Sequence, residues 1–146
     1  MSSVTPKEEV RANYKHFLEI PTRWMDNDVY QHVNNVNYYS YFDTVVNEYL
    51  LREGVLDYES GDVIGFVVET SCQYHRPLQF PDVIDAGVRV TKIGNSSVHY
   101  EVGLFRQGDE AVAATGHFIH VYVRRPELRP TPLPDALRTV LTKILV

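Results

Sequence analysis

The sequence is poor in the residues that mark several large classes of protein. It contains a single cysteine, Cys72, so no disulfide can form within the chain, and this usage is typical of a reducing compartment. It has no uninterrupted run of about 18 apolar residues, the length that a membrane-spanning helix needs. The first residues include Lys7, Glu8 and Glu9 and lack the apolar stretch of a secretory signal. We therefore expect a cytoplasmic protein that does not enter the membrane.

Positive charge is also scarce. The chain carries 14 lysine and arginine residues against 19 aspartate and glutamate residues, which gives a net charge of −5. Nucleic acids and anionic membranes attract basic surfaces, so neither is expected as a general partner. A polyanionic ligand would need a local basic patch.

Several catalytic motifs are missing as well. We find no Gly-x-Ser-x-Gly turn, which serine hydrolases of the α/β class use, and no glycine-rich loop that would bind phosphate. The six histidines do not show the spacing of metal ligands, and His117 and His120 should point to opposite faces of a strand because they lie three residues apart. We expect neither a metal ion nor a cofactor.

The 146 residues are enough for a hydrophobic core and predict a single domain, 1–146. Residues 1–13 read as a loose N-terminal arm. Apolar residues recur at helical spacing over residues 36–52 on most of the circumference, which predicts a long buried helix that ends near Gly54. Alternating or β-branched patterns predict strands at residues 17–20, 66–74, 84–91, 98–104 and 111–123.

The C-terminal part holds half of the eight prolines, within residues 126–134. We interpret residues 126–146 as an extended Pro-rich strap followed by a short helix over about residues 134–145. The order of the elements predicts an α+β fold, in which an antiparallel β-sheet of about five strands wraps one long central helix.

The most informative segment is residues 23–38, which places two aspartates, a histidine and two asparagines directly before the long helix. Asn34 or Asn35 can cap the helix, and the free N–H groups of its first turn, with the helix dipole, favour negative charge. Asp28 lies a few residues upstream. A carboxylate that faces an oxyanion site suits acyl transfer, with the carboxylate as base or nucleophile. Alternatively, Asp26 and Asp28 cap the loop or pair with Arg23, and chemistry alone does not choose between the two aspartates.

The same segment, residues 26–38, resembles the signature of the hotdog-fold acyl-CoA thioesterases of the 4-hydroxybenzoyl-CoA thioesterase-like family. The family pattern has an aromatic residue, Asp-x-Asp, a Gly-His-Val-Asn-Asn turn and a tyrosine in the first turn of the central helix. The segments at residues 74–77, 80–82 and 92–98 also resemble the family, so the similarity extends over nearly the whole chain.

The resemblance implies that Asp28 is the catalytic carboxylate and that the backbone N–H of Asn35 polarises the thioester carbonyl. Asp26 then has a structural role. Two positions depart from the family pattern: Gln31 and Pro81 both stand where glycine is usual. Neither departure affects Asp28.

Five further residues are candidates for substrate binding: His32, Tyr38, Lys92, Asn95 and Ser96. Each also has an ordinary structural explanation. His32 fits a hydrogen-bonded turn, Tyr38 fits the core of a buried helix, and residues 92–96 fit a solvated hairpin.

The family resemblance implies an acyl-CoA substrate and a homodimer or homotetramer. Two other functions remain open: a non-catalytic module that binds or senses acyl-CoA, and a thioesterase that acts on acyl carrier protein. A hotdog dehydratase would carry a catalytic histidine in a differently spaced motif, which is absent from this chain.

Overall fold

The computed structural model describes residues 9–57 and 59–146. Along the chain its elements are η1 (Arg11–Asn13), β1 (His16–Pro21), η2 (Trp24–Asp26), α1 (Val36–Arg52), β2 (Val63–Tyr74), β3 (Val83–Ile93), β4 (Ser97–Arg106), β5 (Val112–Arg124), β6 (Arg129–Pro130) and α2 (Asp135–Thr142). Helix α1 has the predicted bounds. The strands after α1 run beyond the predicted ranges, because backbone pairing continues where the side-chain alternation has stopped.

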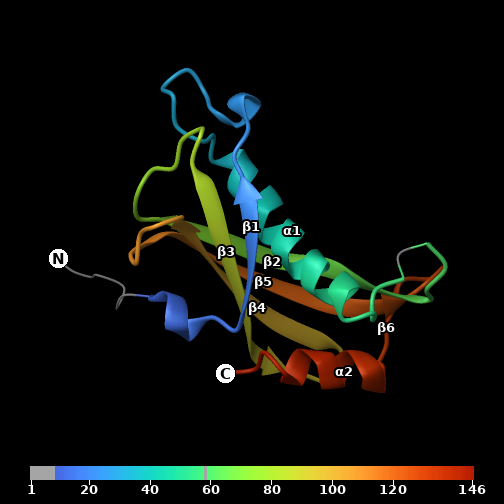
Figure 1. Ribbon diagram of the computed structural model, residues 1–146. Coiled ribbons are helices and arrows are strands. Elements are labelled where there is room, and N and C mark those ends of the chain that lie inside the picture. The colour runs from blue at the N-terminus through green and yellow to red at the C-terminus, as the bar shows by residue number, and fades with distance from the viewer. Residues whose placement is uncertain (1–8, 58) are drawn as a thin grey trace.

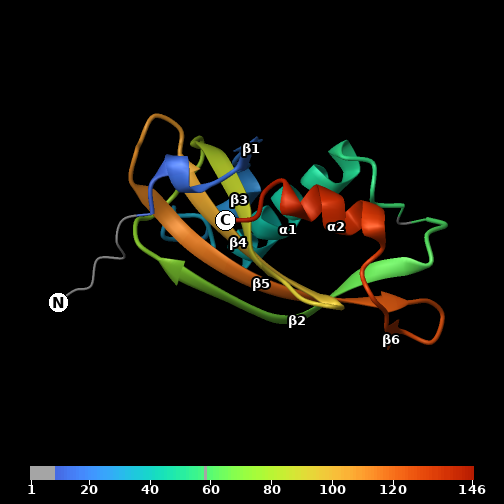
Figure 2. The same ribbon diagram turned by 90° about the horizontal axis from the view of Figure 1, so that it is seen from below.

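The five long strands form one antiparallel sheet in the order β1-β3-β4-β5-β2, and the short β6 pairs with β5. Figure 1 shows α1 crossing one face of this sheet, and the view from below in Figure 2 shows the sheet curling around the helix. This arrangement confirms the predicted α+β hotdog fold. No helix among the described residues combines the length and apolarity needed to cross a bilayer.

The core lies between α1 and the concave face of the sheet. Phe42 and Val45 of α1 are fully buried, and the alternating residues of β3 that face them are fully buried as well. On β5 a Cβ atom at Gly116 would overlap the ring of Phe42. Glycine at this position therefore lets the helix pack closely on the sheet. The fully buried residues of β3 are Ile84, Ala86, Val88 and Val90.

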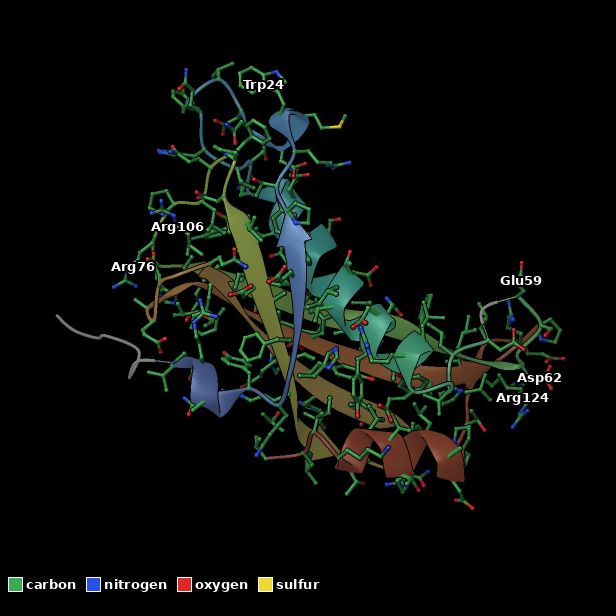
Figure 3. All side chains as sticks on the ribbon, in the orientation of Figure 1. Trp24, Glu59, Asp62, Arg76, Arg106 and Arg124 are labelled. Atoms are coloured by element: carbon green, nitrogen blue, oxygen red, sulfur yellow. The ribbon has the colours of Figure 1, made fainter. Side chains whose placement is uncertain are left out.

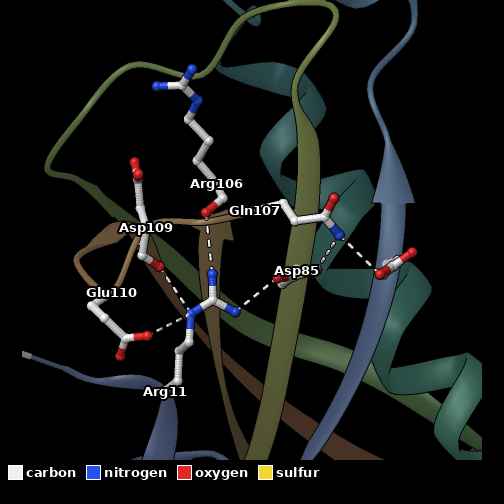
Figure 4. Close-up of polar contacts among 7 residues, drawn as sticks. Arg11, Asp85, Arg106, Gln107, Asp109 and Glu110 are labelled. Carbon is white, nitrogen blue, oxygen red and sulfur yellow. Dashed lines mark hydrogen bonds and ion pairs between the residues drawn. The ribbon is translucent and has the colours of Figure 1, made fainter.

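The N-terminal segment is attached to the sheet from residue 11 onward, which differs from the loose arm expected over residues 1–13; residues 1–8 lie outside the described residues. Figure 4 shows how the Arg11 side chain reaches across the sheet. Its Nη1 lies 2.8 Å from a carboxylate oxygen of Asp85, and its Nε donates to the carbonyl of Asp109 at 2.9 Å. The guanidinium also lies over the ring of Phe105.

The Pro-rich segment folds back along the sheet and ends in α2. The N–H of Leu133 donates to the carbonyl of Asn95, and Arg138 of α2 donates to the carbonyl of Gly94. These bonds fix the strap and the C-terminal helix against the turn between β3 and β4. Leu137 and Leu141 then add the buried face of α2 to the core.

Strand β2 is the sheet edge that carries exposed apolar side chains. Its partner is β5, and its other side has no strand among the described residues. Phe66 is 51% exposed and Val68 is 55% exposed. Natural proteins usually protect such an edge with charge or with a covering element.

Candidate active site

A tight turn follows β1 and η2 and holds the predicted catalytic aspartate. The N–H of Gln31 donates to the carbonyl of Asp28, and the N–H of Asp28 donates to the carbonyl of His32, both at 2.9 Å. Gln31 has a φ of 66°, the left-handed conformation that favours glycine. The turn that the family builds with glycine is therefore retained here with glutamine under backbone strain.

Asp28 is half-buried at the start of this turn. Its Oδ1 accepts the N–H of Tyr30 at 2.8 Å. Its Oδ2 has no hydrogen-bond partner in the part of the chain that the structure describes. One oxygen thus fixes the side chain, and the other is free for a ligand or a water molecule.

The sequence offers Asn34 or Asn35 as the cap of α1. In the structure Asn35 occupies the N-cap position, and the side chain of Asn34 makes the capping hydrogen bond. Asn34 Oδ1 accepts the N–H of Val36 at 3.0 Å, so Asn34 supplies the side-chain cap. Asn35 precedes the first helical residue and is exposed, and its own N–H has no acceptor within residues 9–57 and 59–146. A free N–H at the positive end of a 17-residue helix favours a developing negative charge.

Asp26 lies at the centre of the loop and is only 1% exposed. Its carboxylate accepts hydrogen bonds from Arg23 and from the hydroxyl of Tyr41. Burial alone would raise the pKa of Asp26, but the bonds from Arg23 and Tyr41 outweigh burial and lower it. The residue is therefore ionised, satisfied and inaccessible, which fits a structural role.

A cavity of about 310 Å³ opens beside the N-terminus of α1. It brings together three of the predicted site residues, His32, Asn35 and Tyr38. Asp28 does not line it and lies in the adjoining turn. The remaining lining residues come from the loop entry and from the end of β2 and the segment after it: Val33, Tyr74, His75, Arg76 and Pro77.

Three predicted binding residues are not part of this site within one chain. Lys92, Asn95 and Ser96 lie at the far end of β3, whose other end at Val83 pairs with Pro21 next to the loop. The nine residue steps from Val83 to Lys92 span about 30 Å along a strand. Lys92 and Asn95 are exposed, and the backbone of Ser96 accepts the N–H of Tyr122.

The list of candidates from the sequence omitted Tyr74 and Arg76. The Tyr74 ring packs edge-on against Tyr38 at 4.9 Å, and its hydroxyl donates to the carbonyl of Asn35 at 3.4 Å. Arg76 donates to the carbonyl of Val112 at 2.9 Å and brings positive charge to the cavity wall. Figure 3 shows its side chain at the outer edge of the molecule. The signal for both was present, because residues 74–77 resemble the family.

The described residues hold no group of three or more histidine, cysteine, aspartate or glutamate side chains placed to bind a metal ion. The chemistry available at the N-terminus of α1 is thus that of a carboxylate oxygen, a helix-terminal N–H and a nearby guanidinium. These groups suit acid–base or nucleophilic attack on a polarised carbonyl.

Comparison with known families gives a match to the thioesterase-like superfamily over residues 22–141. Among curated proteins, YsmA of Bacillus subtilis (strain 168) is 25% identical over 97 residues, which cover 65% of this chain and 65% of YsmA. The chain therefore matches slightly less than two thirds of the length of that relative.

Solved structures show the same fold. The PA5185 protein from Pseudomonas aeruginosa strain PAO1 is 49% identical, with a TM-score of 0.92 over 94% of this chain and 96% of that protein. PA2801 from Pseudomonas aeruginosa, a candidate thioesterase, is 30% identical, with a TM-score of 0.82 over 88% of this chain and 98% of that protein. A DHNA-CoA thioesterase from Staphylococcus aureus shares the fold, with a TM-score of 0.79 at 19% identity over 88% of this chain and 89% of that one.

Proposed function

The chain belongs to the thioesterase-like superfamily, and from that premise we propose that it hydrolyses acyl-CoA thioesters to a free acid and CoA. The observation that carries the proposal is the position of Asp28 in the turn that leads into the N-terminus of α1. One carboxylate oxygen of Asp28 has no partner among the described residues, and the turn that holds Asp28 bonds to His32, which lines the same cavity as Asn35. The thioester carbonyl oxygen would accept the N–H of Asn35, which stabilises the charge that develops on that oxygen.

Two routes are compatible with this arrangement. In the first, Asp28 takes a proton from water as the water oxygen adds to the carbonyl carbon. The C–S bond then breaks, and Asp28 returns the proton to the departing sulfur, so CoA leaves as the thiol and Asp28 is again ionised. In the second, a carboxylate oxygen of Asp28 adds to the carbonyl carbon, CoA leaves, and water hydrolyses the mixed anhydride to regenerate Asp28. Both routes need Asp28 to be ionised when the reaction begins.

The residues that line the cavity suit a thioester whose carrier bears phosphate groups. Arg76 can face a phosphate, while Tyr38 and Tyr74 offer aromatic surface. His32 lines the same cavity and would contact the thioester or its carrier. Lys92, Asn95 and Ser96 could reach a ligand at this site only from a second copy of the chain.

The proposed enzyme is a homodimer joined through β2. The apolar side chains on this edge strand would be covered if two copies paired antiparallel and continued the sheet. Such pairing brings the Tyr74 end of one β2 to the Val63 end of the other. The site at α1 of one copy would then adjoin residues of its partner.

The test measures the hydrolysis of short, medium, long and aryl acyl-CoAs by the wild type and by Asp28→Asn. The release of free thiol is the readout. Asparagine keeps the oxygen that accepts the Tyr30 N–H, so the turn should persist while the charge is lost. We expect a loss of at least ~100-fold in kcat. Near-normal turnover by a folded Asp28→Asn protein would falsify the assignment of Asp28.

Two outcomes would point to the alternatives. A folded wild type that binds acyl-CoA without turnover would be a binding or sensing module. Turnover that needs acyl carrier protein instead of CoA would change the carrier but not the chemistry. The net charge of −5 disfavours that acidic partner.

A further inference from the structure

A second cavity lies away from the N-terminus of α1. It has a volume of about 320 Å³ and lies between the C-terminal half of α1 and strands β2 and β5. This size is at the lower end of the range for small-molecule sites. Its walls are mostly apolar, and Asp43 and Asn47 of α1 add polar groups on one side. Strands β2 and β5 contribute Gly65, Val67, His120 and Tyr122.

The unusual member of this wall is His120 on β5, which is only 4% exposed. Neither ring nitrogen has a hydrogen-bond partner among the described residues. Aromatic rings surround the imidazole, with the ring centres of Tyr100 and Phe118 at 5.0 and 5.6 Å. Buried polar groups normally have a partner, so two unpartnered nitrogens on one side chain indicate a missing one.

Gly65 of β2 lies against the imidazole. A Cβ atom at this position would lie 3.0 Å from Nδ1 of His120. Both residues line the cavity; in the register of β2 and β5, Gly65 pairs with Tyr122, and His120 pairs with Val67. Glycine on β2 therefore places no side chain between the strand and Nδ1.

The imidazole is uncharged at neutral pH, because burial lowers the pKa of His120 to about 4. A neutral imidazole has one nitrogen that donates and one that accepts. It can bind a hydroxyl or a carbonyl oxygen, and it offers no positive charge to a carboxylate.

We propose that this cavity binds the acyl part of the thioester and that His120 selects acyl groups that carry a hydroxyl or oxo oxygen at the end remote from the thioester. The inference rests on the proposed thioesterase function. The apolar walls contact the hydrocarbon, and His120 supplies the hydrogen bond for the terminal oxygen.

The cavity serves the partner's reaction site in the proposed dimer. Asn47 lies 12 residues beyond Asn35 on α1, which corresponds to about 18 Å along the helix. Antiparallel pairing of β2 places the Gly65 end of one copy near the Tyr74 end of the other. An acyl group held at Asn35 of one copy thereby points to the His120 cavity of its partner.

The experiment measures binding by calorimetry in the Asp28→Asn protein, so that the thioester survives. The ligands are ω-hydroxyacyl-CoAs and unsubstituted acyl-CoAs of matched length, from butanoyl to decanoyl. At the length that reaches His120, the hydroxylated ligand should bind about tenfold more tightly. Equal affinities at every length would overturn the proposal.

The variant that assigns the effect is His120→Phe in the same background, because phenylalanine replaces the imidazole by a ring without nitrogen. It should bind both ligands of a pair with similar affinity. A preference that survives the substitution in a folded protein would overturn the role of His120. If the variant does not fold, the ring signals of His120 in NMR spectra of Asp28→Asn provide the measurement. These signals should shift more with the hydroxylated ligand than with the unsubstituted ligand of the same length. Identical shifts would overturn the role of His120.

These readouts separate the two proposals. A wild type that hydrolyses acyl-CoA while the Asp28→Asn protein shows no preference supports the thioesterase and rejects the role of His120. A wild type without turnover, together with a clear preference, rejects the thioesterase and establishes the His120 cavity as a binding site.

Discussion

The hydroxyl of Tyr41 donates a 2.8 Å hydrogen bond to Oδ2 of Asp26 and thereby joins α1 to the loop that carries Asp28. Burial, followed by the neighbouring Asp26 carboxylate, raises the pKa of Tyr41, so its hydroxyl keeps its proton and remains a donor. Asn37 adds a second link, because its side chain donates to the carbonyl of Asp26 at 3.0 Å. The loop is thus fixed to the first two turns of the helix.

Tyr41→Phe should lower the stability of the fold. The change removes a donor to a buried carboxylate, which costs about 1.5–3 kcal/mol of unfolding free energy. Urea denaturation measures the loss. Tyr39→Phe is the matched control, since Tyr39 is an exposed tyrosine two positions earlier, and it should have little effect. An equal loss in both variants would contradict the role of the Asp26 bond.

Gln31→Gly should raise stability. Gln31 occupies the left-handed conformation, with a φ of 66°. Glycine relieves the backbone strain, which raises the free energy of unfolding. It also raises the entropy of the unfolded chain, which offsets part of that increase. The net effect is about 0.5–1 kcal/mol in favour of the variant. Thermal unfolding measures the change. Gln31→Ala keeps the Cβ atom and therefore should not produce the gain; a similar gain in both variants would show that backbone strain is not its source.

Stability should fall in acid partly because of His120. The ordinary histidine pKa is 6.5, and burial lowers that of folded His120 to about 4. Between these values the unfolded chain binds a proton that the folded chain does not, so the contribution present above pH 6.5 is lost as the pH falls. At about pH 5 the loss is ~2 kcal/mol, and it reaches ~3 kcal/mol below the folded pKa.

Denaturation curves of the wild type and His120→Phe between about pH 7.5 and about pH 4.5 isolate this contribution, because the other titrating groups are common to both proteins. The wild type should lose stability faster than the variant as the pH falls. Parallel pH profiles would show that His120 takes up its proton without difficulty in the folded state.

Val68→Lys should dissociate the proposed homodimer. Val68 is exposed near the middle of β2, where a two-fold axis between antiparallel strands would bring the two lysines close together. Analytical ultracentrifugation of the wild type and the variant measures the change in mass. Thr91→Lys adds the same charge at an exposed position of β3 and should leave the mass unchanged. An unchanged mass for Val68→Lys would exclude this strand from the interface.

The sequence predicts the parts of the fold that depend on local periodicity. Helix α1 begins at Val36 and ends at Arg52 as expected, because apolar residues on most faces and the Gly54 end signal act over a few residues. The two-residue strand β6 was not predicted, since it has no pattern of its own and exists through pairing with Val123 and Arg124.

The candidate site was predicted only in part. Residues close together in the sequence, such as His32, Asn35 and Tyr38, do meet in one cavity. Lys92 could not be placed from the sequence, because its distance from the loop depends on the register between β1 and β3. The role of His120 cannot be predicted from the sequence, because burial without a hydrogen-bond partner becomes visible only in three dimensions.

The position of β2 in the sheet determines when the protein can fold during its own synthesis. Strand β2 is made early, but its partner β5 follows about 50 residues later, as the pairing of Ser71 with His117 illustrates. At ~5–20 residues per second, the ribosome leaves this apolar segment unpaired for several seconds. The strand order therefore leaves the apolar residues of β2 without their strand partner until β5 emerges.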